Sequence, residues 1–303
     1  MFAIHAPAKV NLYLHVGPPR SDGRHPLDSL VIFTDKRASD RLTFTPGGDG
    51  LHFSVSGDAN SDQIGPADDN LVVRAVRQIE GASGCRIKGQ LQLEKRLPIA
   101  AGIGGGSADA AATLLLMNGA FKLGLSQQRL IDLAAPLGGD VPACVAGVPV
   151  LMRGDGDRVS PYDAHLPELY AVLVTPDVSC PTGPVFRRFD EQNSAQVFEE
   201  MSAPIAQTSE DLCDQLRSSY RNDLQSSAVS MFPVIGALIN ALYEYSTVHF
   251  AAMSGSGATC FAITHTQGAS EMIVRELSER FPRFWAQSVR FGQAGFDPEG
   301  FSL

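Results

Sequence analysis

Apolar and polar residues alternate along short stretches of this chain, and a period of two is typical of strands with one buried face. Residues 9–16 show the pattern most clearly. One face of the predicted strand carries Val10, Leu12, Leu14 and Val16, and the other carries Lys9, Asn11, Tyr13 and His15. Lys9 and Asn11 therefore point the same way, one pleat apart. Taken alone, a polar face of this kind is equally typical of a strand whose outer side meets solvent.

Further strands and several amphipathic helices are predicted along the rest of the chain. Strands are expected near residues 29–34, twice within 41–57 around a hairpin loop at 46–50, and at 87–95, 170–175, 248–253, 259–263 and 284–291. Helices are expected for about ten residues after Asn70, and over 108–123, 126–138 and 269–281, with others starting near 184 and 222. The stretch 57–69 is polar and rich in turn formers.

The periodicity fades between residues 148 and 167, where Gly154-Asp155-Gly156-Asp157 favours a turn. A chain of 303 residues is long for one small domain and comfortable for two. We therefore expect a crossing between two domains here, with one domain over residues 1–158 and the other over 159–303.

The composition of the chain disfavours several classes of binding partner. The chain is 44% hydrophobic and 19% charged, and no apolar run reaches the ~18 residues of a membrane span. The N-terminus has no basic segment followed by an apolar one, and the five cysteines never form a Cys-x-x-Cys pair. The net charge of −9 disfavours nucleic acid. We expect a cytoplasmic protein, monomeric or homodimeric, that binds small molecules and neither nucleic acid nor membrane.

A glycine-rich segment is the strongest chemical signal. Four glycines fall within residues 102–106, Ser107 follows, and strong helix formers begin at Ala108. Glycine lets backbone approach a ligand, and the N-terminus of a helix favours an anion, so the segment predicts a phosphate site. It lacks the lysine of a Walker A loop, and Ser107 stands where a dinucleotide fingerprint needs glycine. A turn that only lets a helix pack closely is the plain alternative.

The segment Pro98–Ser107 resembles the ATP loop of the galactokinase, homoserine kinase, mevalonate kinase and phosphomevalonate kinase (GHMP) superfamily. Its triple glycine followed by Ser-Ala-Asp-Ala-Ala is most similar to the branch that phosphorylates 4-diphosphocytidyl-2-C-methyl-D-erythritol. This resemblance implies a two-domain α+β fold with an N-terminal domain like ribosomal protein S5 and a ferredoxin-like C-terminal domain. The active site is then expected in the cleft between the domains.

The resemblance also implies an ATP site and a Mg²⁺ cofactor. The residues it assigns to ATP are Asn70, Leu71, Lys95, Pro98, Ile99, Ala100, Ala101, Gly102, Ile103, Gly104, Gly105, Gly106, Ser107 and Ala108. Asn70 is in addition a good N-cap for the helix after it. Mg²⁺ is expected to bind mainly phosphates and water, with Ser107 as the one candidate protein ligand.

Two short motifs carry the expected catalytic residues. Gly-Gly-Asp-Val-Pro around Asp140 is similar to the family's Gly-Ala-Asp-Val-Pro, whose aspartate is the catalytic base. From local sequence alone, Asp140 before a proline-containing first turn is a helix N-cap. Ala-Lys-x-Asn-Leu matches the position where the family carries a lysine that contacts the acceptor, here Lys9, and an asparagine beside it, here Asn11.

The expected acceptor site matches the family only in part. His25, Thr182 and Phe186 occupy family positions, although Phe186 is equally typical of core packing. Arg24 stands where the family has a cytosine-stacking tyrosine, and Val31 where it has another aromatic residue. Because a guanidinium is planar, Arg24 is expected to stack on cytosine opposite Phe186, with His25 bonded to the base edge.

The implied reaction transfers the γ-phosphoryl group of ATP to the 2-hydroxyl of 4-diphosphocytidyl-2-C-methyl-D-erythritol, in the non-mevalonate isoprenoid pathway. Two alternatives stay open at this point. A sibling kinase for homoserine, a sugar or a mevalonate derivative is favoured by Arg24 and Val31. A catalytically silent ATP-binding relative is disfavoured because both Lys9 and Asp140 are present.

Overall fold

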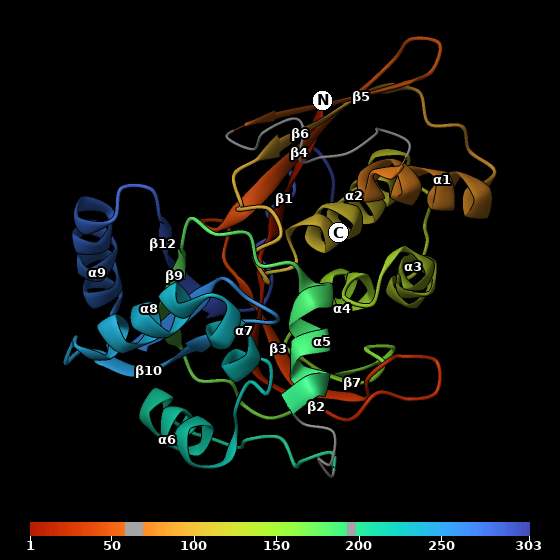
Figure 1. The fold of residues 1–303 in the computed structure, drawn as a ribbon. Coiled ribbons are helices and arrows are strands. Elements are labelled where there is room, and N and C mark those ends of the chain that lie inside the picture. Colours follow the sequence, from red (N-terminus) through yellow and green to blue (C-terminus); the bar gives the residue numbers. More distant parts are fainter. Residues whose placement is uncertain (58–68, 193–197) are drawn as a thin grey trace.

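A computed structural model of the chain describes residues 1–57, 69–192 and 198–303, and most of the stretch expected to be rich in turns lies outside them. The fold is a mixed α+β arrangement of two sheets with helices packed against them, as expected (Figure 1). Its strands and helices follow the predicted order along the chain, with the differences given below.

A four-stranded sheet lies in the N-terminal half. In spatial order its strands are β1 (Phe2–Pro7), β4 (Ser39–Pro46), β6 (Gly89–Lys95) and β5 (Leu51–Gly57). The hairpin expected within residues 41–57 is wrong, because β6 lies between β4 and β5 and pairs with β5 in parallel. Loop 46–50 therefore crosses over β6 instead of joining neighbouring strands.

Helices of the N-terminal half bury one face of this sheet. They are α1 (Leu71–Ser83), α2 (Gly105–Ala120), α3 (Gln127–Ala134), η3 (Ala135–Leu137) and α4 (Val141–Ala146). The central helix α2 packs on β1 and β4 and is flanked by α1 and α4. Because other elements cover it on several sides, residues 108–114, 116 and 117 are buried, which is more than the single stripe of an amphipathic helix.

An eight-stranded sheet joins the two halves. Its order is β10 (Val248–Met253), β11 (Cys260–Thr264), β9 (Leu169–Thr175), β12 (Trp285–Gly292), β3 (Leu27–Thr34), β7 (Val150–Gly154) and β8 (Arg158–Pro161), with β2 (Lys9–Val16) also paired to β3. Its C-terminal helices are α5 (Thr182–Gln192), α6 (Ser209–Ser219), α7 (Gln225–Met231), α8 (Pro233–Tyr243) and α9 (Gln267–Arg280). Strands β1, β7 and β8 and helices α6 and α8 were not predicted; β7 and β8 fall where the periodicity fades.

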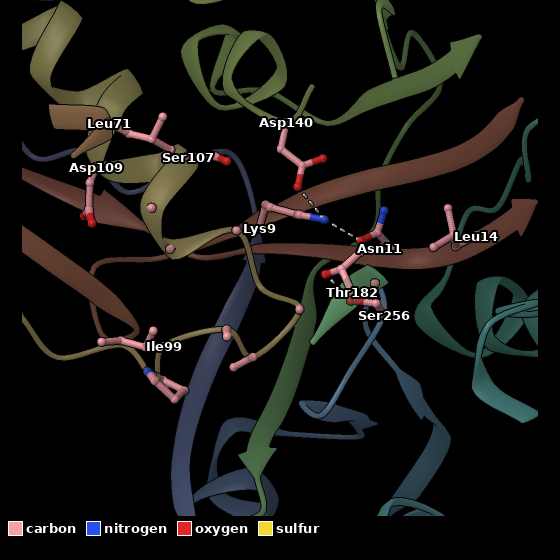
Figure 2. A pocket seen from close by; sticks show the side chains of 18 of the residues that line it. Lys9, Asn11, Leu14, Leu71, Ile99, Ser107, Asp109, Asp140, Thr182 and Ser256 are labelled. Carbon is pink, nitrogen blue, oxygen red and sulfur yellow. Dashed lines mark hydrogen bonds and ion pairs between the residues drawn. The ribbon is translucent and has the colours of Figure 1, made fainter. Parts of the chain in front are cut away.

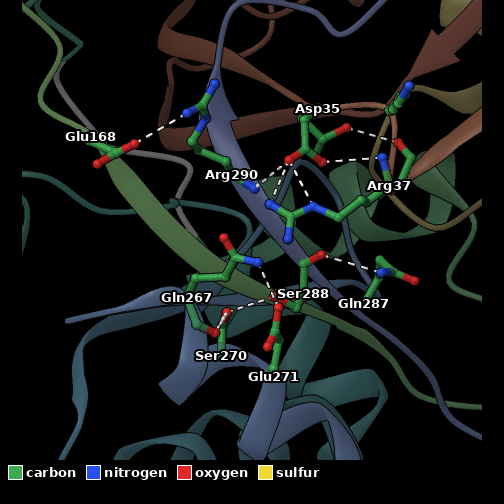
Figure 3. Close-up of polar contacts among 12 residues, drawn as sticks. Asp35, Arg37, Glu168, Gln267, Ser270, Glu271, Gln287, Ser288 and Arg290 are labelled. Atoms are coloured by element: carbon green, nitrogen blue, oxygen red, sulfur yellow. Dashed lines mark hydrogen bonds and ion pairs between the residues drawn. The ribbon is translucent and has the colours of Figure 1, made fainter.

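The seam between the halves lies where β12 meets β3. Their pairing is short, Phe291 with Thr34 and Gly292 with Phe33. Asp35 extends it, because its amide donates to Arg290 O at 3.0 Å and its Oδ2 accepts from the Arg290 amide at 3.2 Å. The same Oδ2 also accepts from the Arg37 guanidinium at 2.9 Å (Figure 3). One continuous sheet therefore fixes the C-terminal half against β3 and its neighbour β2, which carries Lys9 and Asn11.

The chain returns to its N-terminal half after β12. Phe296 and Phe301 pack into the hydrophobic core of the four-stranded sheet and α2, and Glu299 forms a β-bridge with Ala3. All five cysteines are free. Among the described residues, no single helix is long and apolar enough to cross a membrane; α7 and α8 pass that test only together, across a bend of 117°.

Candidate active site

A pocket of about 540 Å³ opens between elements of the two halves (Figure 2). Strand β2 and the glycine-rich segment contribute Lys9, Asn11 and residues 98–107. Helix α5 and the loop after β10 contribute Thr182 and Ser256 from the other side. This is the cleft in which the sequence places the site.

The glycine-rich segment forms the floor of this pocket. Helix α2 begins at Gly105, three residues before the expected Ala108, so the amides of Gly105, Gly106 and Ser107 belong to its first turn. The first four N–H groups of a helix have no partner within the helix, and the dipole is positive there. Gly104, with φ 63°, turns the chain into the helix. The segment is therefore built as an anion cradle.

Most residues predicted to bind ATP line this pocket. They are Asn70, Leu71, Lys95, Pro98, Ile99, Ala100, Ala101, Gly102, Gly104, Gly105, Gly106 and Ser107. Ile103 and Ala108 are not among the lining residues and are instead buried in two hydrophobic cores. Asn70 also caps α1 as expected, because its Oδ1 accepts from the Val72 amide at 2.9 Å.

Lys9 reaches the centre of the pocket from β2. Its Nζ donates to Asn11 Oδ1 at 2.7 Å and lies 3.2 Å from Asp140 Oδ2 (Figure 2). Lys9 is only 5% exposed, so a solvent-facing strand is wrong for β2, whose two faces are both buried. Its side chain passes over Gly104, where a Cβ would lie 2.6 Å from Lys9 Cγ.

Asp140 precedes α4 but does not cap it. Its side chain accepts no hydrogen bond from the helix, and its backbone is helical, with φ −82° and ψ −16°. The carboxylate instead faces the Lys9 ammonium across the pocket. The N-cap interpretation is therefore wrong for this side chain, which is free to meet an acceptor.

Two buried aspartates that the sequence analysis missed hold the base of the glycine-rich segment. The Lys95 ammonium bonds to Asp40 and to Asp109 Oδ2, the latter at 2.8 Å. Asp40 Oδ1 also accepts from the amides of Arg96 and Leu97, at 2.6 and 2.8 Å. Asp40 on β4 thereby holds the chain just before the glycine-rich segment, and Lys95 ties it to Asp109 on α2, just after the segment.

Burial and charge set the ionisation of this triad. Burial raises the pKa of Asp109 to about 8, against the opposing pull of the Lys95 ammonium. Burial alone would lower the pKa of Lys95, but the carboxylates of Asp109 and Asp40 outweigh it and raise that pKa. Asp109 Oδ1 is buried and has no hydrogen-bond partner within the described residues, and Asp109 lines the pocket. The triad thus leaves one oxygen available to a ligand.

A second glycine loop, residues 254–258, closes the other wall. Ser254 Oγ accepts from the Asn11 amide at 3.2 Å and donates to Gly102 O at 3.1 Å. Ser256 Oγ lies 2.9 Å from Thr182 Oγ1, so α5 is tied to this loop (Figure 2). Its Ser-Gly-Ser-Gly sequence is typical of a loop, but the contacts with both walls depend on the fold.

A neighbouring cavity of about 710 Å³ shares Phe186 with the pocket. His25 Nδ1 donates to Gly17 O at 2.9 Å, and its ring centroid lies 4.9 Å from that of Phe186. Arg24 lines the cavity but is largely exposed, 3.8 Å from Asp155. Val31 is buried in the N-terminal core and lines neither cavity. The structure therefore brings His25 and Phe186 together, with Arg24 at the rim.

Comparison with known proteins identifies the family. The model of the GHMP kinases N terminal domain matches residues 70–148, and that of the GHMP kinases C terminal domain matches residues 186–283. The 4-diphosphocytidyl-2-C-methyl-D-erythritol kinase of Hyphomonas neptunium is 45% identical over 291 residues, covering 95% of this chain and 96% of that protein. The enzyme of the same name from Caulobacter sp. is 42% identical over 298 residues, covering 95% and 97%.

Solved structures agree with this assignment. A crystal structure of 4-(cytidine 5'-diphospho)-2C-methyl-D-erythritol kinase superposes with a TM-score of 0.76 at 30% identity, covering 96% of this chain and 99% of that one. A homoserine kinase from Cytophaga hutchinsonii shares the fold, with a TM-score of 0.67 at 17% identity over 99% and 96% of the two chains. The chain therefore belongs to the GHMP kinases and, within them, to the 4-diphosphocytidyl-2-C-methyl-D-erythritol kinase family.

Proposed function

We propose that this enzyme transfers the γ-phosphoryl group of ATP to the 2-hydroxyl of 4-diphosphocytidyl-2-C-methyl-D-erythritol, a step of the non-mevalonate isoprenoid pathway. The observation that carries the proposal is the Lys9–Asp140 pair, 3.2 Å apart, in the same pocket as the anion cradle of α2. The names of relatives at 40–45% identity support the choice of acceptor.

Asp140 acts as the general base and Lys9 as the positioning cation. Asp140 accepts the proton of the acceptor hydroxyl, because its carboxylate makes no capping bond and faces the pocket. Lys9 holds that carboxylate and is itself held by Asn11, so the pair is preorganised. Phosphoryl transfer needs positioning and charge stabilisation more than covalent help, which suits a lysine at the transferring group.

The glycine-rich segment holds the phosphates of ATP through the amides of Gly105, Gly106 and Ser107. The pocket also suits Mg²⁺, because it offers the Ser107 hydroxyl and the buried, unpartnered Oδ1 of Asp109. Bound Mg²⁺ would neutralise phosphate charge beside these two residues. Asn70 and Leu71, at the start of α1, line the nucleotide side of the pocket.

The cavity beside Phe186 takes the cytidine end of the acceptor. His25 and Phe186 supply a base-edge contact and a stacking face, and Arg24 at the rim supplies a planar cation for the second face and the diphosphate. Thr182, held by Ser256, lines the pocket together with Lys9, and Phe186 on the same helix lines both the pocket and this cavity. The acceptor hydroxyl thereby reaches Asp140.

A panel of acceptors with ATP and Mg²⁺, followed as ADP release, tests this proposal. It includes the cytidine-linked polyol, homoserine, galactose and mevalonate. We expect turnover with the first compound only. Turnover with another acceptor, and none with the cytidine compound, would instead identify a sibling kinase.

A further inference from the structure

Two histidines and a glutamate meet on the C-terminal half, far along the chain from the catalytic motifs. Glu210 stands in the first turn of α6, His249 on the edge strand β10, and His265 directly after β11. Their ligand atoms lie within 4.8 Å of one another, and we call them the His249 cluster. None of the three lines either cavity described above.

The three atoms lie close enough together to bind one ion. His249 Nε2 lies 2.6 Å from His265 Nδ1, and Glu210 Oε1 lies 3.7 Å from the first and 4.0 Å from the second. A triangle with sides of 2.6, 3.7 and 4.0 Å has a circumradius of about 2.1 Å, which is the length of Zn–N and Zn–O bonds in proteins. One point is thus at bonding distance from all three atoms.

We propose that the His249 cluster is a Zn²⁺ site with Glu210, His249 and His265 as its protein ligands. Two imidazoles and a carboxylate suit Zn²⁺, whereas Mg²⁺ prefers oxygen ligands alone. The Glu210 and His265 side chains are about half exposed, at 57% and 46%, so an ion can enter and water can fill the remaining position.

Ion binding requires a small local change. Without an ion, one of the two facing nitrogens carries the hydrogen of the His249–His265 bond. That ring moves its proton to its other nitrogen. The two rings, whose centroids lie 3.5 Å apart, separate and turn so that both nitrogens face the ion at tetrahedral angles. The ion then joins α6 to the edge of the eight-stranded sheet, where α6 already packs on β10.

Calorimetric titration of the untagged full chain with ZnCl₂ tests the site. The titration uses the Cys85→Ser background, because Cys85 is the one free thiol that is not buried. We expect one equivalent of Zn²⁺ to bind and to raise the melting temperature, with no competition from a large excess of Mg²⁺. Loss of a ligand should weaken Zn²⁺ binding at least ~10-fold, because loss of a residue that only hydrogen-bonds to a metal ligand already has an effect of this size.

Three variants make the outcome specific. His265→Ala and Glu210→Gln should both weaken Zn²⁺ binding, and the second keeps the shape of an exposed side chain. His165→Ala removes an exposed histidine elsewhere and should bind like the parent. Melting in EDTA and ADP release show that each variant is folded. No saturable binding in the parent, displacement by Mg²⁺, or an affinity equal to that of the parent in both Glu210→Gln and His265→Ala would overturn the site.

Discussion

The sequence is compatible with Asp140 as a helix N-cap or as the catalytic base, and the structure favours the base. Asparagine is as good an N-cap as aspartate, but it cannot accept the proton. We therefore expect Asp140→Asn to lower kcat by ~10²–10⁴-fold, the usual effect of losing a general base, with ATP affinity nearly unchanged. Steady-state kinetics and ATP titration measure the two quantities. Asp163→Asn, the same substitution at an exposed position, is the matched control. Wild-type turnover in both variants would refute the role of Asp140 as the general base.

Phe186 is expected to supply a stacking face for cytosine. Loss of one face costs ~1–3 kcal/mol, so Phe186→Ala should raise the acceptor KM ~10–100-fold, with kcat and the KM for ATP nearly constant. Arg24→Tyr restores the residue usual in the family and should be tolerated. Saturation-transfer NMR with CMP gives a direct readout. A ligand without cytosine contacts, in both wild type and Phe186→Ala, would argue for another acceptor.

His15 lies on the buried polar face of β2, and its Nε2 has no hydrogen-bond partner among the described residues. Burial lowers its pKa below the ordinary 6.5, so the unfolded chain binds the proton more readily than the folded one. This contribution to stability is present above pH 6.5 and is lost as pH falls through the folded pKa. The loss is at most ~1.4 kcal/mol per pH unit.

The free energy of unfolding, measured between pH 7 and pH 5 for wild type and for His15→Gln, isolates the contribution of His15. Burial also lowers the pKa of His5, so wild type and variant share that part of the acid destabilisation. We expect a shallower loss of stability in the variant. Parallel pH profiles for the two proteins would show that His15 does not titrate as described.

Short motifs predicted the catalytic residues, but not the residues that hold them. Lys9, Asn11 and Asp140 were identified because each lies in a local pattern shared with the family. Asp40 lies in no such pattern, and the glycine loop that contains Ser254 does not reveal from its sequence which residues it contacts. Asp40 accepts a hydrogen bond from the backbone amide of Arg96, 56 positions away, and Ser254 accepts one from that of Asn11, 243 positions away. Contacts of that separation depend on the folded sheets and leave no periodic trace in the sequence.

The glycine-rich segment contains glycines of two kinds. Gly102 has φ +76°, and a Cβ there would lie 2.5 Å from Ser254 O, so glycine is required by the fold. Gly105 begins α2, and a Cβ there meets nothing closer than Lys95 Nζ at 3.5 Å. Helix geometry tolerates a side chain at Gly105, but the phosphates of ATP would not.

Gly105→Val should therefore weaken ATP binding at least ~10-fold, because the phosphates would lose one or more charge-assisted hydrogen bonds. The melting temperature should stay near that of wild type. Gly102→Val should instead lower the free energy of unfolding by ~1–3 kcal/mol through backbone strain. Calorimetry and thermal unfolding of both variants make the comparison. Normal ATP affinity in Gly105→Val would remove the segment from the site.

Prediction of elements succeeded where the signal was local. Asn70 and Ser126 were expected to start helices, and each accepts a capping hydrogen bond from the helix after it. The order β1-β4-β6-β5 could not be read from periodicity, because which strands pair depends on tertiary contacts. Strands β7 and β8 were missed because they are short and flank the Gly154–Asp157 turn.

At the scale of the whole molecule, we propose that residues 1–158 and 159–303 are the two units that enclose the site. The sheet that runs through β12 and β3 joins them, and the final residues pack back on the first unit. Residues from both units, Lys9 and Asp140 from the first and Thr182 and Ser256 from the second, therefore line one pocket.

The position of the new phosphate on the product shows whether the enzyme phosphorylates the 2-hydroxyl. C2 of the proposed acceptor carries a methyl group and no hydrogen, whereas C1 and C3 both carry hydrogen. In a proton-coupled ³¹P spectrum of the products from ATP, Mg²⁺ and 4-diphosphocytidyl-2-C-methyl-D-erythritol, we expect a new phosphomonoester singlet. That singlet should form with wild type and be almost absent with Asp140→Asn. A doublet or triplet, or no new monoester with wild type, would contradict it.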